Sequence, residues 1–270
     1  MSGHSKWATT RRHKAAVDAK RGKLFSVLSK ELTIAARDGG GDVDSNPRLR
    51  TVMLKAKQAN MPMDNIQRAV KKGTGELPGM TLEAFIYEGY GAGGVGCIVE
   101  GTTDNKNRAV SEVRSTFSKM GGNLAASGAV AFNFNHMGQF LIDAKGFAKP
   151  QEGINEDLFE LLIEGGAEDI IDHGEEGVEV LCSVSQYDGL AAFLDREKGV
   201  EVITADLAYV PKNTVILKDE ETARKVFRLI EALEVLEDVK SVFANFDMEE
   251  SLLKRVNNAL ENPSSGKKVH

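Results

Sequence analysis

Three helices are predicted from the spacing of apolar residues in the first part of the chain. Leu24, Leu28 and Leu32 recur at intervals of four, which places them on one face of a helix over residues 16–37. The glycine run 39–41 ends this helix, because glycine adopts the left-handed conformation of a C-cap without strain. A row of cations on the opposite side of the helix consists of Lys23, Lys30 and Arg37.

Two shorter helices follow the glycine run. Asn46 is suited to cap a helix and Pro47 to occupy its first turn, and this helix continues towards a break at Pro62. The third helix spans residues 64–72 and carries two lysines in its last turn, where they complement the helix dipole. The segment 73–79 contains three glycines and a proline, which is typical of a linker.

Strand patterns begin after the linker. Residues 83–89 and 95–103 are predicted strands, and the glycine-rich sequence between them is typical of a tight turn. A helix over 107–120 and a strand over 129–134 come next. The order strand, strand, helix, strand corresponds to half of a small α+β sandwich with its helices on one side of the sheet.

A second α+β pattern fills residues 135–205. Its predicted strands are 139–144, 169–171, 177–183 and 201–204, and its predicted helices are 155–164 and 186–198. The first pattern then resumes with strand 213–217, helix 220–236 and strand 240–246. The second pattern therefore reads as an insertion, and a serial arrangement of the same pieces is the alternative topology.

The predicted fold class is α+β and multidomain. A three-helix domain in residues 1–80 precedes two ferredoxin-like α+β domains, one inserted in the other. The outer domain consists of residues 81–134 and 206–248, and the inserted domain of residues 135–205. A last amphipathic helix and a polar tail occupy residues 249–270.

The net charge of −6 is unevenly distributed along the chain. Residues 1–80 contain 16 Lys and Arg and 7 Asp and Glu, a net charge of +9. Residues 81–270 contain 18 basic and 33 acidic residues, and 16 of these acids but only 4 of the bases lie in 135–205. The first segment would attract phosphate and the inserted one would repel it, so we expect residues 1–80 to bind a polyanion.

The basic arm, residues 1–37, and the helix after it supply the candidate nucleic-acid ligands. Their cations are suited to phosphates, and Trp7 to stacking on an unpaired base. A solvated terminus is the ordinary alternative for such a charge run. The candidates are Lys6, Trp7, Arg11, Arg12, Lys14, Lys20, Arg21, Lys23, Lys30, Arg37, Arg48, Arg50, Lys55 and Lys57.

No catalytic or metal-binding motif is found in the sequence. The five histidines lack zinc-ligand spacing, and the glycine-rich Gly89–Gly96 lacks the Lys-Ser/Thr of a P-loop. We therefore expect a non-enzymatic protein without a cofactor or a metal. Cys97 and Cys182 lie in apolar runs, as buried free thiols of a reducing compartment do. No apolar run is long enough to span a membrane, so the expected location is the cytoplasm.

Several motifs in a fixed order carry a family resemblance. They are SGHSKW, DAKRGKLFSVLSKEL, GGGDVDSNPRLR, ANMPMDNIQRA, YEGYGAGG and, more loosely, VPKNTV at Val210–Val215. On these motifs the chain resembles the YebC family, which includes bacterial regulatory proteins and a mitochondrial translational activator. Ala92 stands where the family often has proline, and Met63 where a basic residue is common, which removes a candidate phosphate contact.

The resemblance implies a helical domain, two α+β domains with one inserted in the other, and a role in gene regulation without catalytic residues. Family members are commonly described as DNA-binding transcriptional regulators. The alternative is a ribosome- or RNA-associated translation factor that eases stalled synthesis, for example at proline runs. A third hypothesis is a protein-interaction module that acts through the acidic domain.

The basic arm is compatible with both nucleic-acid hypotheses, because phosphate contacts say little about which polymer supplies them. No helix-turn-helix signature is evident in the sequence, whereas an aromatic residue in a basic arm is suited to unpaired RNA bases. The residues alone therefore favour RNA slightly. The expected partners are duplex DNA or ribosomal or transfer RNA, with the ribosome or a protein at the acidic domain as a further partner, and no membrane.

Overall fold

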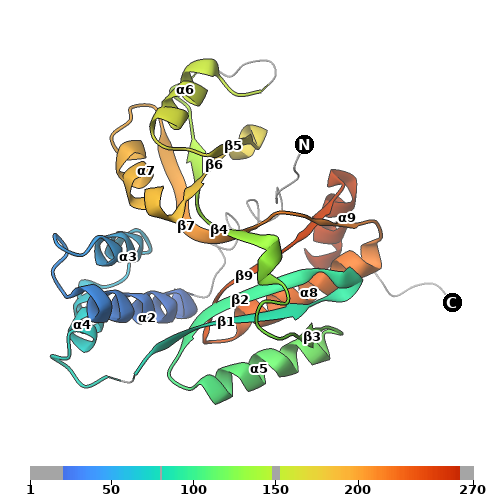
Figure 1. Cartoon of the computed structure of the whole chain (residues 1–270), viewed down its shortest axis with the longest axis horizontal. Helices are drawn as coiled ribbons and strands as arrows, with labels where there is room; N and C mark the ends of the chain where they lie inside the picture. Colours follow the sequence, from blue (N-terminus) through green and yellow to red (C-terminus); the bar gives the residue numbers. More distant parts are fainter. Residues whose placement is uncertain (1–20, 80, 148–152, 262–270) are drawn as a thin grey trace. The chain divides into compact units, whose positions relative to one another are not determined.

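The computed structural model describes residues 21–79, 81–147 and 153–261, which form two compact units (Figure 1). We call Phe132–Thr214 the inserted unit, and the described residues on either side of it, from Arg21 to Ala131 and from Val215 onward, the outer unit. No helix in the described part of the chain is long and apolar enough to cross a membrane.

The helical part of the outer unit has the predicted three helices. They are α2 (Arg21–Gly39), α3 (Pro47–Gln58) and α4 (Met63–Gly73). Leu28 and Leu32 of α2 share a buried core with Leu49 of α3 and Ile66 of α4, so the leucine stripe packs inward as predicted. The glycine run ends α2 as predicted, with Gly40 in the left-handed region at a φ of 85°.

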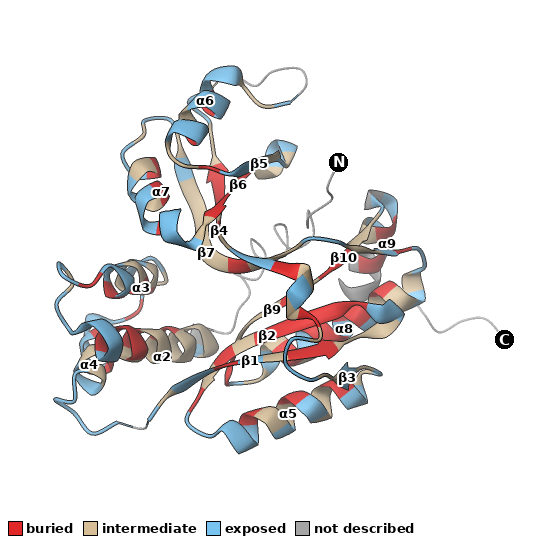
Figure 2. Cartoon of the chain, viewed as in Figure 1, coloured by how far each residue is buried: buried red, intermediate tan, exposed pale blue. Residues whose placement is uncertain are grey.

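One four-stranded sheet, in the order β3-β1-β2-β9, forms the centre of the outer unit. Its strands are β1 (Glu83–Tyr90), β2 (Gly96–Thr103), β3 (Asn123–Leu124) and β9 (Val239–Ala244). The hairpin of β1 and β2 pairs Glu83 with Thr103, and β9 runs antiparallel to β2 on its other side. Buried residues run along β2 (Figure 2). Because β9 follows the insertion in sequence, the insertion topology is confirmed.

Helices and a small second sheet complete the outer unit. They are α5 (Lys106–Lys119), α8 (Glu220–Val235), α9 (Glu250–Glu261), and the parallel pair β8 (Val215–Leu217) and β10 (Phe246–Met248). The helix α5 packs closely on β1, since a side chain at Gly89 would lie 2.6 Å from the ring of Phe117. The turn between β1 and β2 contains the 3-10 helix η1 (Ala92–Gly94), with Gly93 at a φ of 69°.

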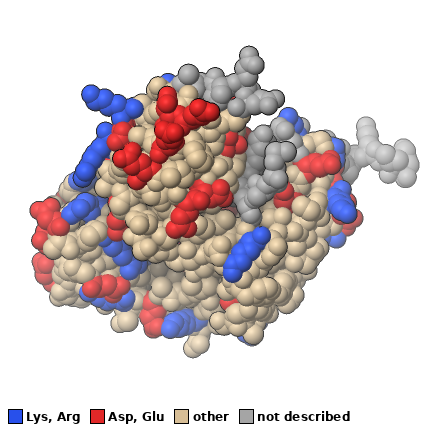
Figure 3. Space-filling model, turned by 45° about the horizontal axis from the view of Figure 1, so that its top comes forward, with Lys and Arg blue, Asp and Glu red and all other residues tan. Residues whose placement is uncertain are grey.

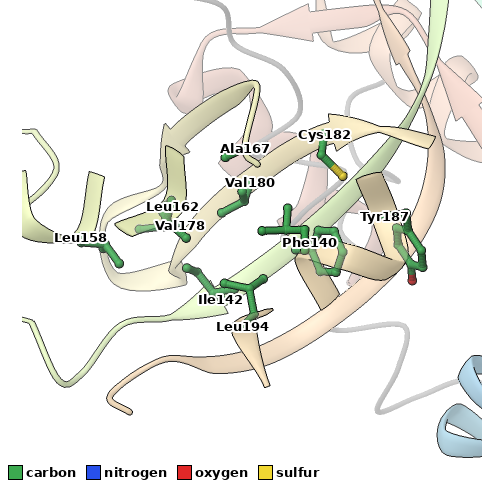
Figure 4. Close-up of a cluster of buried hydrophobic side chains, with 11 residues drawn as sticks. Phe140, Ile142, Leu158, Leu162, Ala167, Val178, Val180, Cys182, Tyr187 and Leu194 are labelled. Atoms are coloured by element: carbon green, nitrogen blue, oxygen red, sulfur yellow. The ribbon is translucent and has the colours of Figure 1, made fainter. Parts of the chain in front are cut away.

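The inserted unit has the strand-helix-strand, strand-helix-strand order of a ferredoxin-like domain. Its elements are β4 (Phe134–Asp143), α6 (Glu156–Glu164), β5 (Asp169–Asp172), β6 (Val178–Ser183), α7 (Tyr187–Leu194) and β7 (Glu201–Pro211). The sheet order is β5-β6-β4-β7, and every pair is antiparallel. Phe140 and Ile142 of β4 meet Leu162 of α6, Val180 of β6 and Leu194 of α7 in one core (Figure 4).

The structure corrects the predicted strands at the edges of the insertion. Residues 131–133 form the 3-10 helix η2, and β4 is one strand where two were predicted at 129–134 and 139–144. The polar Asn135 and His136 interrupt the apolar pattern, but their pairing with Val210 and Tyr209 of β7 keeps this segment extended. The strand predicted at 201–204 continues to Pro211 for the same reason. The inserted unit is consequently wider than the predicted 135–205.

Candidate nucleic-acid interface

The structure describes the side chains of seven of the fourteen predicted ligands. Lys6, Trp7, Arg11, Arg12, Lys14 and Lys20 lie outside the described residues, and of Arg21 only the backbone is described, at the start of α2. The other seven are Lys23, Lys30, Arg37, Arg48, Arg50, Lys55 and Lys57, on α2 and α3.

Lys23 is held by the C-terminal end of α8. Its ammonium group donates a hydrogen bond to the carbonyl oxygen of Leu236 at 2.8 Å and another to that of Glu234. Free carbonyl groups at a helix end carry partial negative charge, so a lysine is a suitable cap there. Burial lowers the pKa of Lys23, and the nearby Lys30 lowers it further, while the carboxylate of Glu234 opposes both.

Lys30 is bound to a buried carboxylate in the outer unit. Its Nζ lies 2.7 Å from Oδ1 of Asp238, whose side chain is 3% exposed. The other oxygen of Asp238 accepts hydrogen bonds from Arg108 at 2.7 Å and from the hydroxyl of Thr103 at 2.8 Å. Burial raises the pKa of Asp238, but the hydrogen bonds from these three side chains outweigh it and hold the pKa below its usual range.

Arg37, the last member of the row, donates to the carbonyl oxygen of Leu82 at 2.6 Å and pairs with Asp38. The row on α2 is therefore a second packing face, which joins the helix to the α+β part of the outer unit. This differs from the expectation that the row faces a phosphate backbone. The physical reason is that its cations already bind carbonyl oxygens of the protein and the buried carboxylate of Asp238, and a phosphate would have to displace these contacts.

The predicted ligands on α3 are more accessible. Arg48 and Arg50 are exposed; Arg48 forms a 3.4 Å ion pair with Asp38, and Arg50 donates to the carbonyl oxygen of Asp44. Lys55 is half-buried and has a partner of its own. Lys57 is exposed and forms no ion pair within the described part of the chain.

Three cations outside the predicted set of ligands form an exposed basic face on α4. Arg68, Lys71 and Lys72 of α4 are exposed, and none forms an ion pair with another described residue. Their spacing of three and four residues places them on one side of the helix. The spacing in the sequence QRAVKK is the signal that identifies this face, since the helix dipole accounts for the position of the two lysines but not for that of Arg68.

Four residues, Ala59–Pro62, connect α3 to α4. Asn60 has a φ of 56°, which turns the chain sharply, and Met61 is buried in the helical core. Both helices pack against α2 (Figure 1). Two helices joined by a turn of this length have the connectivity of a helix-turn-helix motif, in which the second helix enters the major groove of DNA.

Three other groups with potential chemistry, His173, Cys97 and Cys182, are buried or already paired. The described residues contain no group of three or more His, Cys, Asp or Glu that could hold a metal ion. His173 Nε2 lies 2.6 Å from a carboxylate oxygen of the buried Glu179, whose other oxygen accepts from Gln139. Burial raises the pKa of the Cys97 thiol to about 12. Burial and the nearby carboxylate of Glu168 raise the pKa of the Cys182 thiol to about 11. Neither thiol is therefore a ready nucleophile.

Comparison with known families covers nearly the whole chain. Residues 5–76 match the family described as TACO1/YebC protein N-terminal domain, and residues 82–246 match the TACO1/YebC second and third domain. The chain is 47% identical to a conserved hypothetical protein from Aquifex aeolicus of known crystal structure. That match has a TM-score of 0.77 and covers 87% of this chain and 93% of the other.

Curated relatives match 94–95% of the chain. A protein of Opitutus terrae is 51% identical over 254 residues, which are 94% of this chain and 99% of that protein. A protein of Persephonella marina is 47% identical over 95% of this chain and all of its own length. One of Treponema pallidum is 49% identical over 94% of this chain and all of its own. Each of the three is named "probable transcriptional regulatory protein".

Proposed function

Because the chain belongs to the TACO1/YebC family, we propose that it is a cytoplasmic, non-enzymatic regulator of gene expression of the DNA-binding transcriptional type. The names of its relatives support the regulatory role. The structure of α4 is the observation that favours DNA. This helix follows a four-residue turn and exposes Arg68, Lys71 and Lys72 without an acidic partner in the described part of the chain.

The exposed side chains of α4 are of the types that contact bases and phosphates. Gln67 is suited to the edge of adenine and Arg68 to that of guanine in the major groove, and Lys71 and Lys72 to the phosphates beside it. Asp64, one turn before Arg68, is suited to accept a hydrogen bond from cytosine. The basic arm supplies further phosphate contacts along the duplex, with Lys6, Arg11, Arg12, Lys14 and Lys20 as its proposed ligands.

A translation factor that binds ribosomal or transfer RNA is the second candidate, and Trp7 is the observation that favours it. An indole among cations can stack only on a base that is unpaired, as in single strands and loops of RNA. The cations of α4 and of the arm serve this function equally well, because phosphates are common to both polymers.

The test is a triple substitution, Arg68→Ala, Lys71→Ala and Lys72→Ala, measured on a duplex selected from a random library. If the three cations contact phosphates or bases, the slope of log affinity against log salt should flatten by about two to three. The matched control is Lys198→Ala, Lys218→Ala and Arg228→Ala, which removes the same charge from exposed positions outside α2, α3 and α4. The control should leave the slope unchanged.

Two results decide between the candidates. An unchanged slope in the α4 variant would overturn the role of this helix. If no duplex is selected, while Trp7→Ala weakens single-stranded RNA binding by about 1–3 kcal/mol at an unchanged salt slope, the protein is a translation factor instead.

A further inference from the structure

The inserted unit presents an apolar pair on α6 that no other described element of this unit covers. Phe159 and Ile163 on α6 are each 47% exposed. Their spacing of four residues places them side by side on the helix. Leu158 and Leu162 anchor the same helix in the core of the unit, where they are 3% and 0% exposed. The exposed pair is therefore held in a fixed position next to the buried face.

Three carboxylates border this apolar pair. Glu156, Glu160 and Glu164 recur at intervals of four, which places them in a row beside Phe159 and Ile163 on the outside of α6. All three are exposed, and none pairs with a cation within the described ranges. Like charges at this spacing destabilise a helix, and Glu164 also lies at the negative end of the helix dipole.

The arrangement on α6 differs from that on α8, the other strongly acidic helix. There Glu220 pairs with Arg224 and Glu221 with Lys225, each one turn apart on the same helix. The inserted unit has few cations to offer its own carboxylates, since residues 132–214 contain 17 acidic and 5 basic residues. Figure 3 shows that acidic side chains gather in groups on the face in view. A partner of the row on α6 must therefore bring its own positive charge.

We propose that the α6 face, formed by Phe159, Ile163, Glu156, Glu160 and Glu164, is the docking site of the chain's own N-terminal segment, residues 2–14. This segment has the complementary chemistry, because it contains four Lys and Arg, no Asp or Glu, and the indole of Trp7. The indole is suited to the apolar pair and the cations to the carboxylate row.

The length of the N-terminal segment supports this choice of occupant. Fourteen residues of chain join Trp7 to Arg21, the first described residue, and they reach about 46 Å when extended. A segment tethered to its own site has an effective concentration of about a millimolar, so even a weak contact would be well occupied. A separate basic protein would have to reach the same occupancy by affinity alone.

Docking has a consequence for nucleic-acid binding, and this consequence alone rests on the proposed function. A docked segment cannot contact phosphate, so a nucleic acid has to displace it from the α6 face. If nine-tenths of the molecules are docked, the apparent affinity falls about tenfold. The acidic unit would thereby suppress non-specific binding by the basic arm.

Trp7 is the only tryptophan in the chain, and its fluorescence reports the docking directly. The measurement is acrylamide quenching of the whole chain, without nucleic acid, against a synthetic peptide of residues 1–20. The quenching constant of the whole chain should be at least about twofold lower, in proportion to the docked fraction. Because no nucleic acid is present, the result is independent of the proposed function.

Two variants and a matched control locate the site. Glu156→Gln/Glu160→Gln/Glu164→Gln should raise the quenching constant to that of the peptide, and so should Phe159→Ala/Ile163→Ala, which keeps the charge. The control, Asp188→Asn/Asp195→Asn/Glu201→Gln, removes three exposed carboxylates elsewhere in the inserted unit and should have no effect.

Three outcomes would overturn the proposal. One is equal quenching of the wild-type chain and the peptide. Another is an equal effect of the control and of the α6 triple variant, which would indicate diffuse attraction instead of a defined face. The third is a loss of protection on dilution, which would assign the segment to the α6 face of a second copy.

Discussion

Two buried carboxylates are central to the outer unit, and each is stabilised by several donors. Glu88 on β1 is 4% exposed and accepts hydrogen bonds from the backbone N–H groups of Gly128, Val130 and Ala131 at 2.6, 2.6 and 2.7 Å. Burial raises its pKa, but these hydrogen bonds lower it further than burial raises it. Asp238 is stabilised in the same way by side chains. Buried charge is tolerated in both cases because every donor is supplied by the fold.

The first prediction concerns Asp238→Asn. This change removes the negative charge that Lys30 and Arg108 share, so we expect the free energy of unfolding at pH 7 to fall by about 2–3 kcal/mol. Urea unfolding measures the difference. The control is Asp104→Asn, which breaks a more exposed contact of the same Arg108 and should cost less than about 1 kcal/mol.

The lowered pKa of Asp238 also predicts how the effect of this substitution depends on pH. Since the pKa of Asp238 is lowered on folding, its ionised form stabilises the protein fully above the unfolded pKa of about 4. That contribution is lost as the pH falls through the still lower folded pKa. The difference between wild type and Asp238→Asn should therefore shrink below about pH 4. A difference that persists unchanged at pH 3 would show that packing, not charge, is lost.

At the scale of single elements, α2 is the helix that connects the parts of the outer unit. Its leucine face packs on α3 and α4, and its cation row contacts the end of α8 and the buried Asp238. The cap of the next helix strengthens this connection. The side chain of Asn46 accepts from the N–H of Leu49 at 3.0 Å and donates to the carbonyl oxygens of Ala35 and Gly40 at 2.8 and 2.7 Å.

The second prediction is that Asn46→Ala costs more than the loss of an ordinary cap. It removes one capping bond and two bonds that bind the end of α2 to the start of α3, and we expect a loss of about 2–3 kcal/mol. Asn105→Ala is the matched control, because the side chain of Asn105 caps α5 through a single bond to the N–H of Arg108. Thermal unfolding should show a loss of only about 1 kcal/mol for the control. Equal losses would mean that the two bonds to α2 contribute nothing.

Caps, turns and apolar stripes were predictable from the sequence because they depend on neighbouring residues. Asn46, the glycine run after α2 and the leucine stripe all behave as predicted. The cation row of α2 and the inward position of Glu88 were not predictable in this way, because both depend on partners far away in sequence. Periodicity identifies the two faces of a helix but does not tell whether a charged face meets water or a buried carboxylate.

At the scale of the whole molecule, the chain enters and leaves the inserted unit through two segments that lie side by side. The backbone N–H of Lys212 donates to the carbonyl oxygen of Asn133 at 2.7 Å, and that of Asn213 to the side chain of Asn133 at 3.1 Å. Phe134 of β4 pairs with Pro211 of β7 just beyond. Adjacent ends are the usual geometry of a tolerated domain insertion. Each unit also has a core of its own, so we expect that the inserted unit can be removed without exposing the core of the outer unit.

The last prediction is that excision of residues 132–214, with Ala131 joined to Val215 by a short glycine-serine linker, leaves nucleic-acid affinity equal or higher. The excised residues carry a net charge of −12 and so repel phosphate, while the cations of α4 and the basic arm remain. Equilibrium binding to the selected duplex measures the effect, and retained helical circular dichroism establishes that the outer unit is folded. The control is the whole chain carrying the α6 triple variant, which should approach the affinity of the excised chain if docking of the N-terminal segment accounts for the gain. A folded excised chain that binds more than about tenfold more weakly, a loss of about 1.4 kcal/mol, would mean that the inserted unit itself contacts the nucleic acid.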